Sequence, residues 1–388
     1  MAIEINKQKI EEVLTRGVEE MIVKESLQKK LESGEKLRLY FGIDPTGSKL
    51  HLGHAVVLWK LREFCDLGHE VILLIGDFTA KIGDPSGRDV MRTPLSDKQI
   101  KENMKDYKKQ ASKILNFSKV KLMHNSKWLS KLNFADILKL SSYITVGQML
   151  HREMFDKRIK ENAPISLSEF MYPLMQGYDS VAMNVDLEIA GNDQLFNTLV
   201  GRDLQKIYNN KEKNVLAMKL LLGTDGRKMS KTYDNAIYLD DAPSNMYGKI
   251  MSIDDNLISD YVELCTNLDS NEIKKMPNPR DQKARLAKEI VNIYHGEKEA
   301  QKAEEEFNKT FRDKNPEFQK VAFGSREVSI LDLLVELQLA SSKNEAKRLI
   351  LQKAVKINGE IQEDWQKIIK TGTGMKIQVG PRKFLELV

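Results

Sequence analysis

The sequence predicts an α/β protein in which a parallel-sheet domain is followed by an all-helical segment and a small α+β module. From Leu37 to about Gly223, short apolar runs alternate with helical stretches, which is typical of a parallel sheet covered on both faces. From about Asp254 to Phe311 the strand signals vanish, and they return only after Arg326. These changes along the chain predict three successive regions.

Length and composition limit the class of protein. The chain has 388 residues, too many for one typical core, and 41% of them are hydrophobic and 30% charged, as in soluble globular proteins of two or three domains. No apolar run approaches a membrane span, and the N-terminus lacks the apolar core of a secretion signal. The net charge of +5 permits a polyanionic partner without identifying one. Cys65 and Cys265 lie far apart in the sequence, so we expect neither a disulfide framework nor a zinc site. We expect the protein to lie in a reducing cytoplasm.

The first strand is expected at Leu37–Ile43, where β-forming residues follow one another. The next stretch has apolar residues at helical spacing and stops at Gly68, and a second strand follows at Glu70–Asp77. This βαβ unit places the loop Asp44–His54 at the carboxyl end of the first strand, where open parallel sheets bind ligands. Further strands are expected at Lys119–Asn125 and Asn184–Gly191.

The C-terminal third begins with an amphipathic helix that ends at Gly296, and a polar linker is expected over Asn308–Ser329. Beyond it, the run Ser342 to Glu345 predicts a capping box that opens the second of two helices. The pair Asn358-Gly359, flanked by alternating residues, predicts a β-hairpin. Two helices followed by a small sheet make a compact module.

The loop "DPTGSKLHLGH" has the residues of a nucleotide site. His51 and His54 stand three residues apart at the start of a helix, on one face and near its positive end. Gly53 between them leaves the backbone bare, so that a flat ring could lie against it. Taken alone, such a pair is more typical of a turn with two surface histidines. Zinc fits less well, because no third ligand of suitable spacing is evident.

Four further motifs carry polar groups. "DGRKMSKT" (Asp225 to Thr232) places lysines beside hydroxyls, as in a phosphate clamp, although a charged surface loop has the same composition. In "YPLMQGYDS", Tyr172, Gln176 and Asp179 line one helix face that is too polar for a core. "GDPSGR" (Gly83 to Arg88) and "AGNDQLFN" each follow a predicted strand and could also be loops or N-caps.

Together, and in this order, the motifs resemble the signatures of class I aminoacyl-tRNA synthetases. "YFGIDPTGSKLHLGH", "IGDPSGR", "YPLMQGYD" and "GNDQ" resemble bacterial tyrosyl-tRNA synthetases, and the tail "VSILDLLVELQLASSKNEAKRLILQKAVKINGE" resembles an S4-type RNA-binding module. The resemblance covers Leu37 to Val388. It implies a Rossmann-like catalytic domain at 1–223, a KMSK-type loop with a helical anticodon-binding domain at 224–322, and an S4-like domain at 323–388.

The resemblance also implies a tyrosine–tRNA ligase, which makes tyrosyl-adenylate from L-tyrosine and ATP and then transfers tyrosine to the 3′ end of tRNA(Tyr). The residues implied for tyrosine are Tyr40 and Asp179 at the phenol, Asp84, Tyr172 and Gln176 at the ammonium group, and Gln194 beside the substrate. Those implied for catalysis are Thr46, His51, His54, Lys228, Lys231 and Thr232. Those implied for ATP are Gly42, Asp44, Gly53, His54, Asp193, Met229, Ser230 and Lys231.

Further expectations concern cofactors and partners. Mg²⁺ is expected with ATP as substrate, without a tightly bound cofactor or metal-ligating residues. The family implies a homodimer, and no membrane partner is expected. In the tail, Lys343, Lys347 and Arg348 share a helix face, which is either an RNA-binding face or an ordinary solvated one.

Three alternatives remain to be weighed. A tryptophanyl-tRNA synthetase fits less well, because an indole has one donor and no acceptor, whereas Tyr40 and Asp179 suit a phenol. A catalytically inactive synthetase-like RNA-binding protein could lose His51, His54 or Lys231, and all three are present. A purely structural α/β protein does not explain the polar helix face of "YPLMQGYDS".

Overall fold

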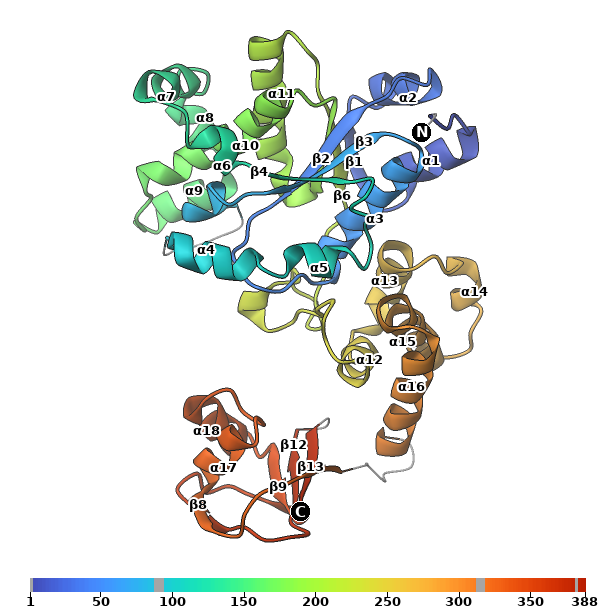
Figure 1. Cartoon of the computed structure of the whole chain (residues 1–388), viewed down its shortest axis with the longest axis vertical. Helices are drawn as coiled ribbons and strands as arrows, with labels where there is room; N and C mark the ends of the chain where they lie inside the picture. The colour runs from blue at the N-terminus through green and yellow to red at the C-terminus, as the bar shows by residue number, and fades with distance from the viewer. Residues whose placement is uncertain (1–2, 87–93, 312–317, 381–382) are drawn as a thin grey trace. The chain divides into compact units, whose positions relative to one another are not determined.

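The computed structural model describes residues 3–86, 94–311, 318–380 and 383–388 (Figure 1). The chain divides into two compact units: Met1–Asp241 with Ile253–Leu286, and Ala242–Ser252 with Ala287–Val388. The last two residues of the "GDPSGR" motif and the middle of the expected linker fall outside the described residues. Within the described ranges, no helix is long and apolar enough to span a membrane.

A six-stranded sheet is the centre of the first unit (Figure 1). Its strand order is β1-β6-β5-β2-β3-β4, in which β1 runs antiparallel to β6 and the other neighbours are parallel. The predicted α/β fold class is therefore confirmed. The strands are β1 (Val18–Ile22), β2 (Arg38–Ile43), β3 (Glu70–Ile75), β4 (Lys121–His124), β5 (Leu187–Gly191) and β6 (Asn214–Met218).

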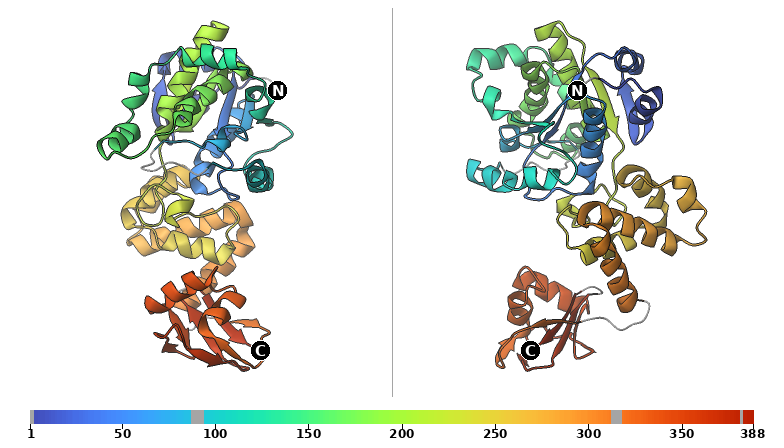
Figure 2. Two further views of the ribbon diagram at one scale, coloured as in Figure 1. Left: turned by 90° about the vertical axis from the view of Figure 1, so that its left-hand side faces the viewer. Right: turned by 45° about the vertical axis from the view of Figure 1, so that its right-hand side comes forward.

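The sheet has a topological switch point between β2 and β5. From β2 the chain adds β3 and β4 on one side, and it then returns to add β5 and β6 on the other. Right-handed crossovers in opposite directions place their helices on opposite faces. Accordingly, α3 (Leu52–Asp66) lies on one side, and α10 (Leu167–Met183) and α11 (Leu195–Asn209) lie on the other (Figures 1 and 2). The crevice at such a switch point is where these sheets bind ligands.

Two glycines bring α10 and α11 into close contact. A Cβ atom at Gly177 would lie 3.1 Å from the backbone nitrogen of Gly201, and a Cβ at Gly201 would lie 3.2 Å from the Cα of Gly177. Neither position has room for a side chain. The polar helix face on α10 is thereby held firmly against the rest of the unit.

Smaller helices complete the first unit. Residues 134–150 form two short helices, because Thr145 caps the second of them. The bounds are α1 (Lys7–Thr15), α2 (Lys24–Glu32), η1 (Thr79–Lys81), α4 (Asp97–Met104), α5 (Tyr107–Ala111), α6 (Ser126–Leu129), α7 (Phe134–Ser141), α8 (Val146–Leu150), α9 (Glu153–Lys160), η2 (Asn192–Gln194), η3 (Lys231–Tyr233), η4 (Asp255–Leu257), α13 (Ile258–Cys265) and α14 (Ser270–Lys274).

The predicted all-helical segment is confirmed by α13, α14, α15 (Pro279–His295) and α16 (Glu297–Phe311). The residues of α15 up to Leu286 belong to the first unit and the later ones to the second. Within the second unit, α12 (Pro243–Met251) packs on α16, where the rings of Tyr247 and Phe307 lie 5.4 Å apart.

The C-terminal part of the second unit contains the expected two helices and small sheet. Ser342 caps the second helix as predicted, but Glu345 reaches back to the backbone of Ser341 rather than of Ser342. Asn358 and Gly359 have φ of 50° and 87°, as a tight hairpin turn requires. The elements are β7 (Gln319–Val321), β8 (Glu327–Ser329), α17 (Ile330–Glu336), α18 (Lys343–Leu351), β9 (Val355–Ile357), β10 (Glu360–Ile361), β11 (Ile368–Lys370), β12 (Lys376–Val379) and β13 (Lys383–Leu387).

Candidate active site

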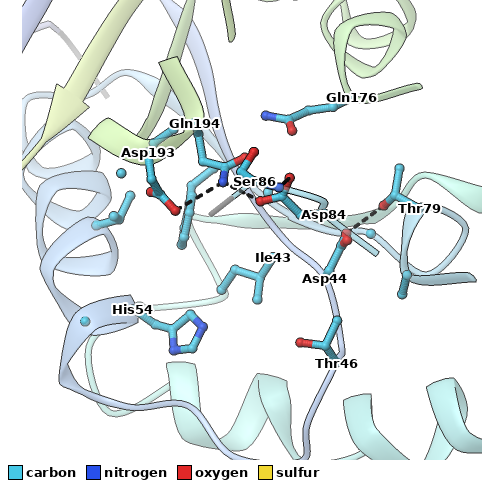
Figure 3. Close-up of a pocket in the computed structure, with 18 of the residues that line it drawn as sticks. Ile43, Asp44, Thr46, His54, Thr79, Asp84, Ser86, Gln176, Asp193 and Gln194 are labelled. Atoms are coloured by element: carbon cyan, nitrogen blue, oxygen red, sulfur yellow. Dashed lines mark hydrogen bonds between the residues drawn. The ribbon is translucent and has the colours of Figure 1, made fainter. Parts of the chain in front are cut away.

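A cavity of about 880 Å³ lies in the first unit at the carboxyl ends of the parallel strands (Figure 3). Every residue predicted for tyrosine, ATP or catalysis lines it. They are Tyr40, Gly42, Asp44, Thr46, His51, Gly53, His54, Asp84, Tyr172, Gln176, Asp179, Asp193, Gln194, Lys228, Met229, Ser230, Lys231 and Thr232. The three basic residues predicted for RNA lie elsewhere, in α18 of the second unit.

One wall of the cavity is the start of α3. His51 is the N-cap residue of that helix, and its backbone N–H donates to His54 Nδ1 at 3.2 Å. The two rings are 3.9 Å apart. Burial and the nearby Lys228 ammonium lower the pKa of His54 to about 4, and burial, His54 and Lys228 lower that of His51 well below its usual value. At neutral pH both imidazoles are therefore uncharged hydrogen-bonding groups.

The patch at Gly53 is narrower than the sequence predicts. A Cβ atom at Gly53 would lie 3.0 Å from His51 Nδ1 and 3.1 Å from His51 Cε1. In this conformation the imidazole of His51 itself lies against the bare backbone where we expected a ligand ring. Gly53 nevertheless lines the cavity.

The opposite wall is the loop that carries Lys228 and Lys231. Lys228 forms an ion pair with Asp193 of the "GNDQ" motif, and its backbone bridges to Leu222. The Lys231 side chain runs beside Gly47, where a Cβ would lie 3.4 Å from Lys231 Cδ. Both lysines are exposed. The loop therefore brings two cations to the same space that the two histidines face.

The deep end of the cavity holds Tyr40 and Asp179, which are 1% and 3% exposed. Asp179 accepts from Trp128 Nε1 at 2.7 Å and from Asn125 Nδ2 at 3.1 Å. Burial raises the pKa of the Asp179 carboxyl well above its usual value, and these two donors counteract part of that rise. Burial and the charges of Glu188 and Asp179 also raise the pKa of Tyr40, so its hydroxyl stays neutral.

Polar side chains connect the middle of the cavity. Gln194 Nε2 donates to Asp84 at 2.6 Å, and Tyr172 Oη donates to Asp44 at 2.9 Å. Gln176 Nε2 donates to Glu188 at 3.1 Å. In Figure 3, Thr46 and His54 lie on one side, Asp84, Asp193 and Gln194 lie on the other, and Ile43 is drawn between them.

Among the described residues, no group of three or more His, Cys, Asp or Glu side chains could hold a metal ion. The cavity contains carboxylates, amides, hydroxyls, imidazoles and lysines, from three motifs after strands, one helix face and one loop. Such a set can bind an amino acid at one end and phosphates at the other.

Comparisons with known proteins agree with this arrangement. The family described as tRNA synthetases class I (W and Y) matches residues 31–312, and the tyrosine–tRNA ligase SYY-like C-terminal domain matches residues 306–378. The tyrosine–tRNA ligase of Thermotoga maritima is 48% identical over 97% of this chain and 96% of its own. That of Carboxydothermus hydrogenoformans is 46% identical over 97% of each chain.

The chain belongs to the tyrosine–tRNA ligases of class I. Solved structures agree on the fold. A mitochondrial tyrosyl-tRNA synthetase from Aspergillus nidulans has a TM-score of 0.66 at 24% identity and covers 79% of this chain and 95% of its own. One from Archaeoglobus fulgidus, complexed with L-tyrosine, has a TM-score of 0.62 at 23% identity and covers 76% and 99%. The predicted family and ligase activity are thus confirmed.

Sequence reasoning missed a set of residues that hold the loop before α3. Tyr107 Oη donates to the carbonyl of Gly47 at 2.6 Å, and Asn103 Nδ2 to that of Pro45 at 2.9 Å. Gln110 donates to Ser48 O at 2.9 Å and accepts from Leu50 N at 2.7 Å. The three side chains follow a helical spacing across α4 and α5, but they alternate with lysines, so the stretch looks like a solvated face.

Asn235 is a second residue that sequence reasoning missed. It is 2% exposed and holds the lysine loop from inside. Its amide nitrogen donates to Asp225 at 2.6 Å and to Lys228 O at 3.1 Å, and its oxygen accepts from Ser230 N at 2.8 Å. It stands just beyond the "DGRKMSKT" motif, and no feature of the sequence distinguishes it from an ordinary turn residue.

Proposed function

We propose that the family's activity is carried out in this cavity, with L-tyrosine at the deep end and ATP across the two walls. Tyrosine reacts with ATP to give tyrosyl-adenylate and pyrophosphate, and a ribose hydroxyl at the 3′ end of tRNA(Tyr) then displaces AMP. The observation that supports this is that one cavity is lined by every residue predicted for tyrosine, ATP or catalysis.

At the deep end, Tyr40 and Asp179 bind the phenolic hydroxyl. A ligand without that hydroxyl leaves part of the hydrogen-bonding capacity of both groups unused in a buried place, which is unfavourable. Asp84, Tyr172 and Gln176 hold the ammonium group, for which the Asp84 carboxylate supplies the charge, and Gln194 lies beside them. The hydrogen bond from Gln194 to Asp84 supports this placement.

At the other end, the residues align two anions and stabilise charge on the phosphates. The tyrosine carboxylate is ionised at neutral pH, so its attack on the α-phosphate needs no general base. Thr46, His51 and His54 donate hydrogen bonds from the fixed wall, and Lys228, Lys231 and Thr232 act from the loop. The other ATP contacts are proposed at Gly42, Asp44, Gly53, Asp193, Met229 and Ser230. Mg²⁺ comes with ATP as part of the substrate, without a protein cage of its own.

The proposed catalytic region comprises residues 1–223. The tRNA is proposed to contact the two regions that follow it in the chain, the helical region at 224–322 and the S4-like region at 323–388. In α18, Lys343 pairs with Asp332 at 2.6 Å, Lys347 lies 3.8 Å from the ring centre of Trp365, and Arg348 is exposed. RNA phosphates could replace Asp332 as the partner of Lys343. Such binding would weaken as salt rises.

We also propose a homodimer in the cytoplasm. Large apolar side chains are exposed along the segment that follows β4: Phe134 at 77%, Leu138 at 57%, Val146 at 63% and Leu167 at 78%. Apolar groups so exposed within one segment are typical of a surface that another chain covers. The two cysteines are free and buried, which suits a reducing compartment.

The experiment that tests the function is tyrosine-dependent exchange of labelled pyrophosphate into ATP, with phenylalanine and tryptophan as controls. We expect strong exchange with tyrosine and only trace exchange with phenylalanine and tryptophan. A protein that binds RNA but exchanges pyrophosphate with none of the three amino acids would instead be the catalytically inactive RNA-binding alternative.

A further inference from the structure

A buried ion pair lies at the deep end of the cavity, where Glu188 is a lining residue and Lys213 is not, and none of the roles proposed above uses it. Lys213, just before β6, pairs with Glu188 of β5. The two residues are 0% and 2% exposed. Taking two charges out of water is costly. A protein in which apolar residues of similar volume replace a buried ion pair is often as stable or more stable. The pair therefore needs an explanation other than stability, and its contacts provide one.

The pair reaches Tyr40 through Ser180, which is also fully buried. Lys213 Nζ donates to Ser180 Oγ at 2.9 Å, and Ser180 Oγ donates to Glu188 Oε2 at 3.4 Å. Tyr40 Oη lies 3.0 Å from Ser180 Oγ. An ammonium group can only donate and a carboxylate can only accept, so the Ser180 hydroxyl has one lone pair left, which can accept the proton of Tyr40. The Tyr40 hydroxyl also interacts with the Glu188 carboxylate itself. Ser180 and Glu188 together therefore restrict the direction of the Tyr40 hydroxyl.

The same carboxylate also reaches the ammonium end of the proposed tyrosine site. Glu188 Oε1 accepts from Gln176 Nε2 at 3.1 Å, while Gln176 Oε1 accepts from Asn197 Nδ2 at 3.0 Å. These two contacts determine which side of the Gln176 amide is oxygen and which is nitrogen. One carboxylate thus orients a side chain at each end of the amino-acid site.

The Lys213 ammonium group and the Ser180 hydroxyl pack closely against Gly201. A Cβ atom at Gly201 would lie 2.6 Å from Lys213 Nζ and 3.0 Å from Ser180 Oγ. The close contact of α10 with α11 therefore holds the ammonium group against the serine. A rigid support of this kind is what a precise substrate site requires.

We propose that Lys213 and Glu188 are positioning residues for amino-acid selection: through Ser180 they fix the Tyr40 hydroxyl, and Glu188 also fixes the Gln176 amide. The proposal rests on the assignment of Tyr40 and Gln176 to the substrate made above. Binding of the substrate tyrosine depends on the direction of the Tyr40 hydroxyl, because its phenol forms a hydrogen bond there. Phenylalanine has no hydroxyl that could form this bond. Loss of the support should therefore harm tyrosine selectively.

The test uses two variants of the full-length protein, Ser180→Ala and Lys213→Met, with kcat/KM measured for tyrosine and phenylalanine by pyrophosphate exchange. Ser180→Ala keeps both charges of the ion pair and removes the hydroxyl that links them to Tyr40, so it serves even if Lys213→Met fails to fold. We expect kcat/KM for tyrosine to fall by about tenfold or more, as for loss of a buried polar contact, and that for phenylalanine by less than about twofold.

The matched control is Lys211→Met, which removes a lysine two residues away. Lys211 pairs with Asp186 at 2.6 Å and does not line the cavity. We expect this variant to keep the wild-type ratio of tyrosine to phenylalanine. If the pair has only a structural role, Ser180→Ala should lower kcat/KM for tyrosine and for phenylalanine by the same factor. That result would overturn the proposal.

Tyr40→Phe separates this proposal from the assignment on which it rests. If Tyr40→Phe itself leaves the tyrosine preference unchanged, the phenol site has been wrongly assigned. If Tyr40→Phe lowers the preference but Ser180→Ala does not, the positioning role is overturned. We expect Ser180→Ala to have no further effect on the ratio when added to Tyr40→Phe, because both act through the same hydroxyl.

Discussion

The two ends of the cavity are built in opposite ways. At the amino-acid end, Tyr40, Asp179, Ser180 and Glu188 are all nearly inaccessible, and each is held by partners from other elements. At the phosphate end, the cations are exposed on a loop, and one of them, Lys228, is held across the cavity by an ion pair. On the roles proposed above, the groups that select the amino acid are buried and held by several partners, whereas the lysines that stabilise charge are exposed.

The largest effect should come from the exposed cations. We expect Lys231→Ala to slow pyrophosphate exchange by about 100-fold or more, because a charge on the transferring phosphate loses its partner. Tyrosine binding, measured by equilibrium dialysis, should stay unchanged. Lys206→Ala, which removes an exposed partner of Glu212, is the control. An equal loss of tyrosine affinity in Lys231→Ala would contradict the separation of the two ends.

Asp84→Asn should weaken tyrosine binding, which Lys231→Ala should leave unchanged. Removing the charge that meets the substrate ammonium group should raise KM for tyrosine by about 10- to 50-fold, which corresponds to one charge-assisted hydrogen bond. KM for ATP should change little. Steady-state exchange kinetics at varied tyrosine and varied ATP distinguish the two. If only KM for ATP changes, the assignment of Asp84 to the tyrosine ammonium group is wrong.

Asn235→Ala tests whether the loop needs its internal support. The side chain holds both sides of the loop, so its loss should let the lysines leave their position and lower kcat for exchange by about tenfold. The affinity for tyrosine should not change. Asn271→Ala, at an exposed position far along the chain, is the control. Wild-type kcat in Asn235→Ala would show that the loop holds its shape without this residue.

Gln110→Met should act on the fixed wall. It leaves Ser48 O and Leu50 N without their partner, and should lower the free energy of unfolding by about 1–2 kcal/mol. Urea unfolding measures this change, and exchange kinetics should show only a modest fall in kcat. If the variant is as stable as the wild type, water must replace the Gln110 amide in its hydrogen bonds to Ser48 O and Leu50 N.

The smallest effect concerns pH. Because the pKa of His54 is about 4, exchange should show no step from this residue near pH 6.5, and its rate should fall only as the pH approaches 4. The folded protein takes up this proton less readily than the unfolded chain, so His54 removes stability as the pH falls from about 6.5 to 4. Lys228→Met should move the acid limb of the rate profile upward, because it removes a positive charge that lowers this pKa.

The sequence predicted the strands whose ends carry the motifs, and β2 to β5 lie where they were expected. It did not single out β1 or β6. β1 contains two glutamates and pairs antiparallel at the edge of the sheet, so its pattern is that of neither a buried strand nor a helix. Loops at strand ends are readable because motif and strand are adjacent in the sequence. Pairs such as Lys213 with Tyr40 lie far apart in the sequence and meet only through the fold.

The roles of the motif residues were read from chemistry and resemblance, and the structure adds which of them touch. It brings Lys228 to Asp193 and Tyr172 to Asp44, neither of which follows from spacing. It also places the ring of His51 over Gly53, where a bare patch was expected. Contacts of this kind depend on side-chain packing between elements, which periodicity does not encode.

The glycine contact between α10 and α11 has a consequence for how this protein tolerates change. Gly201 carries no functional group and does not line the cavity, yet any side chain there must displace the Lys213 ammonium group. Randomised libraries meant to alter the accepted amino acid would usually leave such a position out. A side chain there should nevertheless disturb the Lys213 ammonium group, and such a change should impair discrimination between amino acids before it impairs ATP binding.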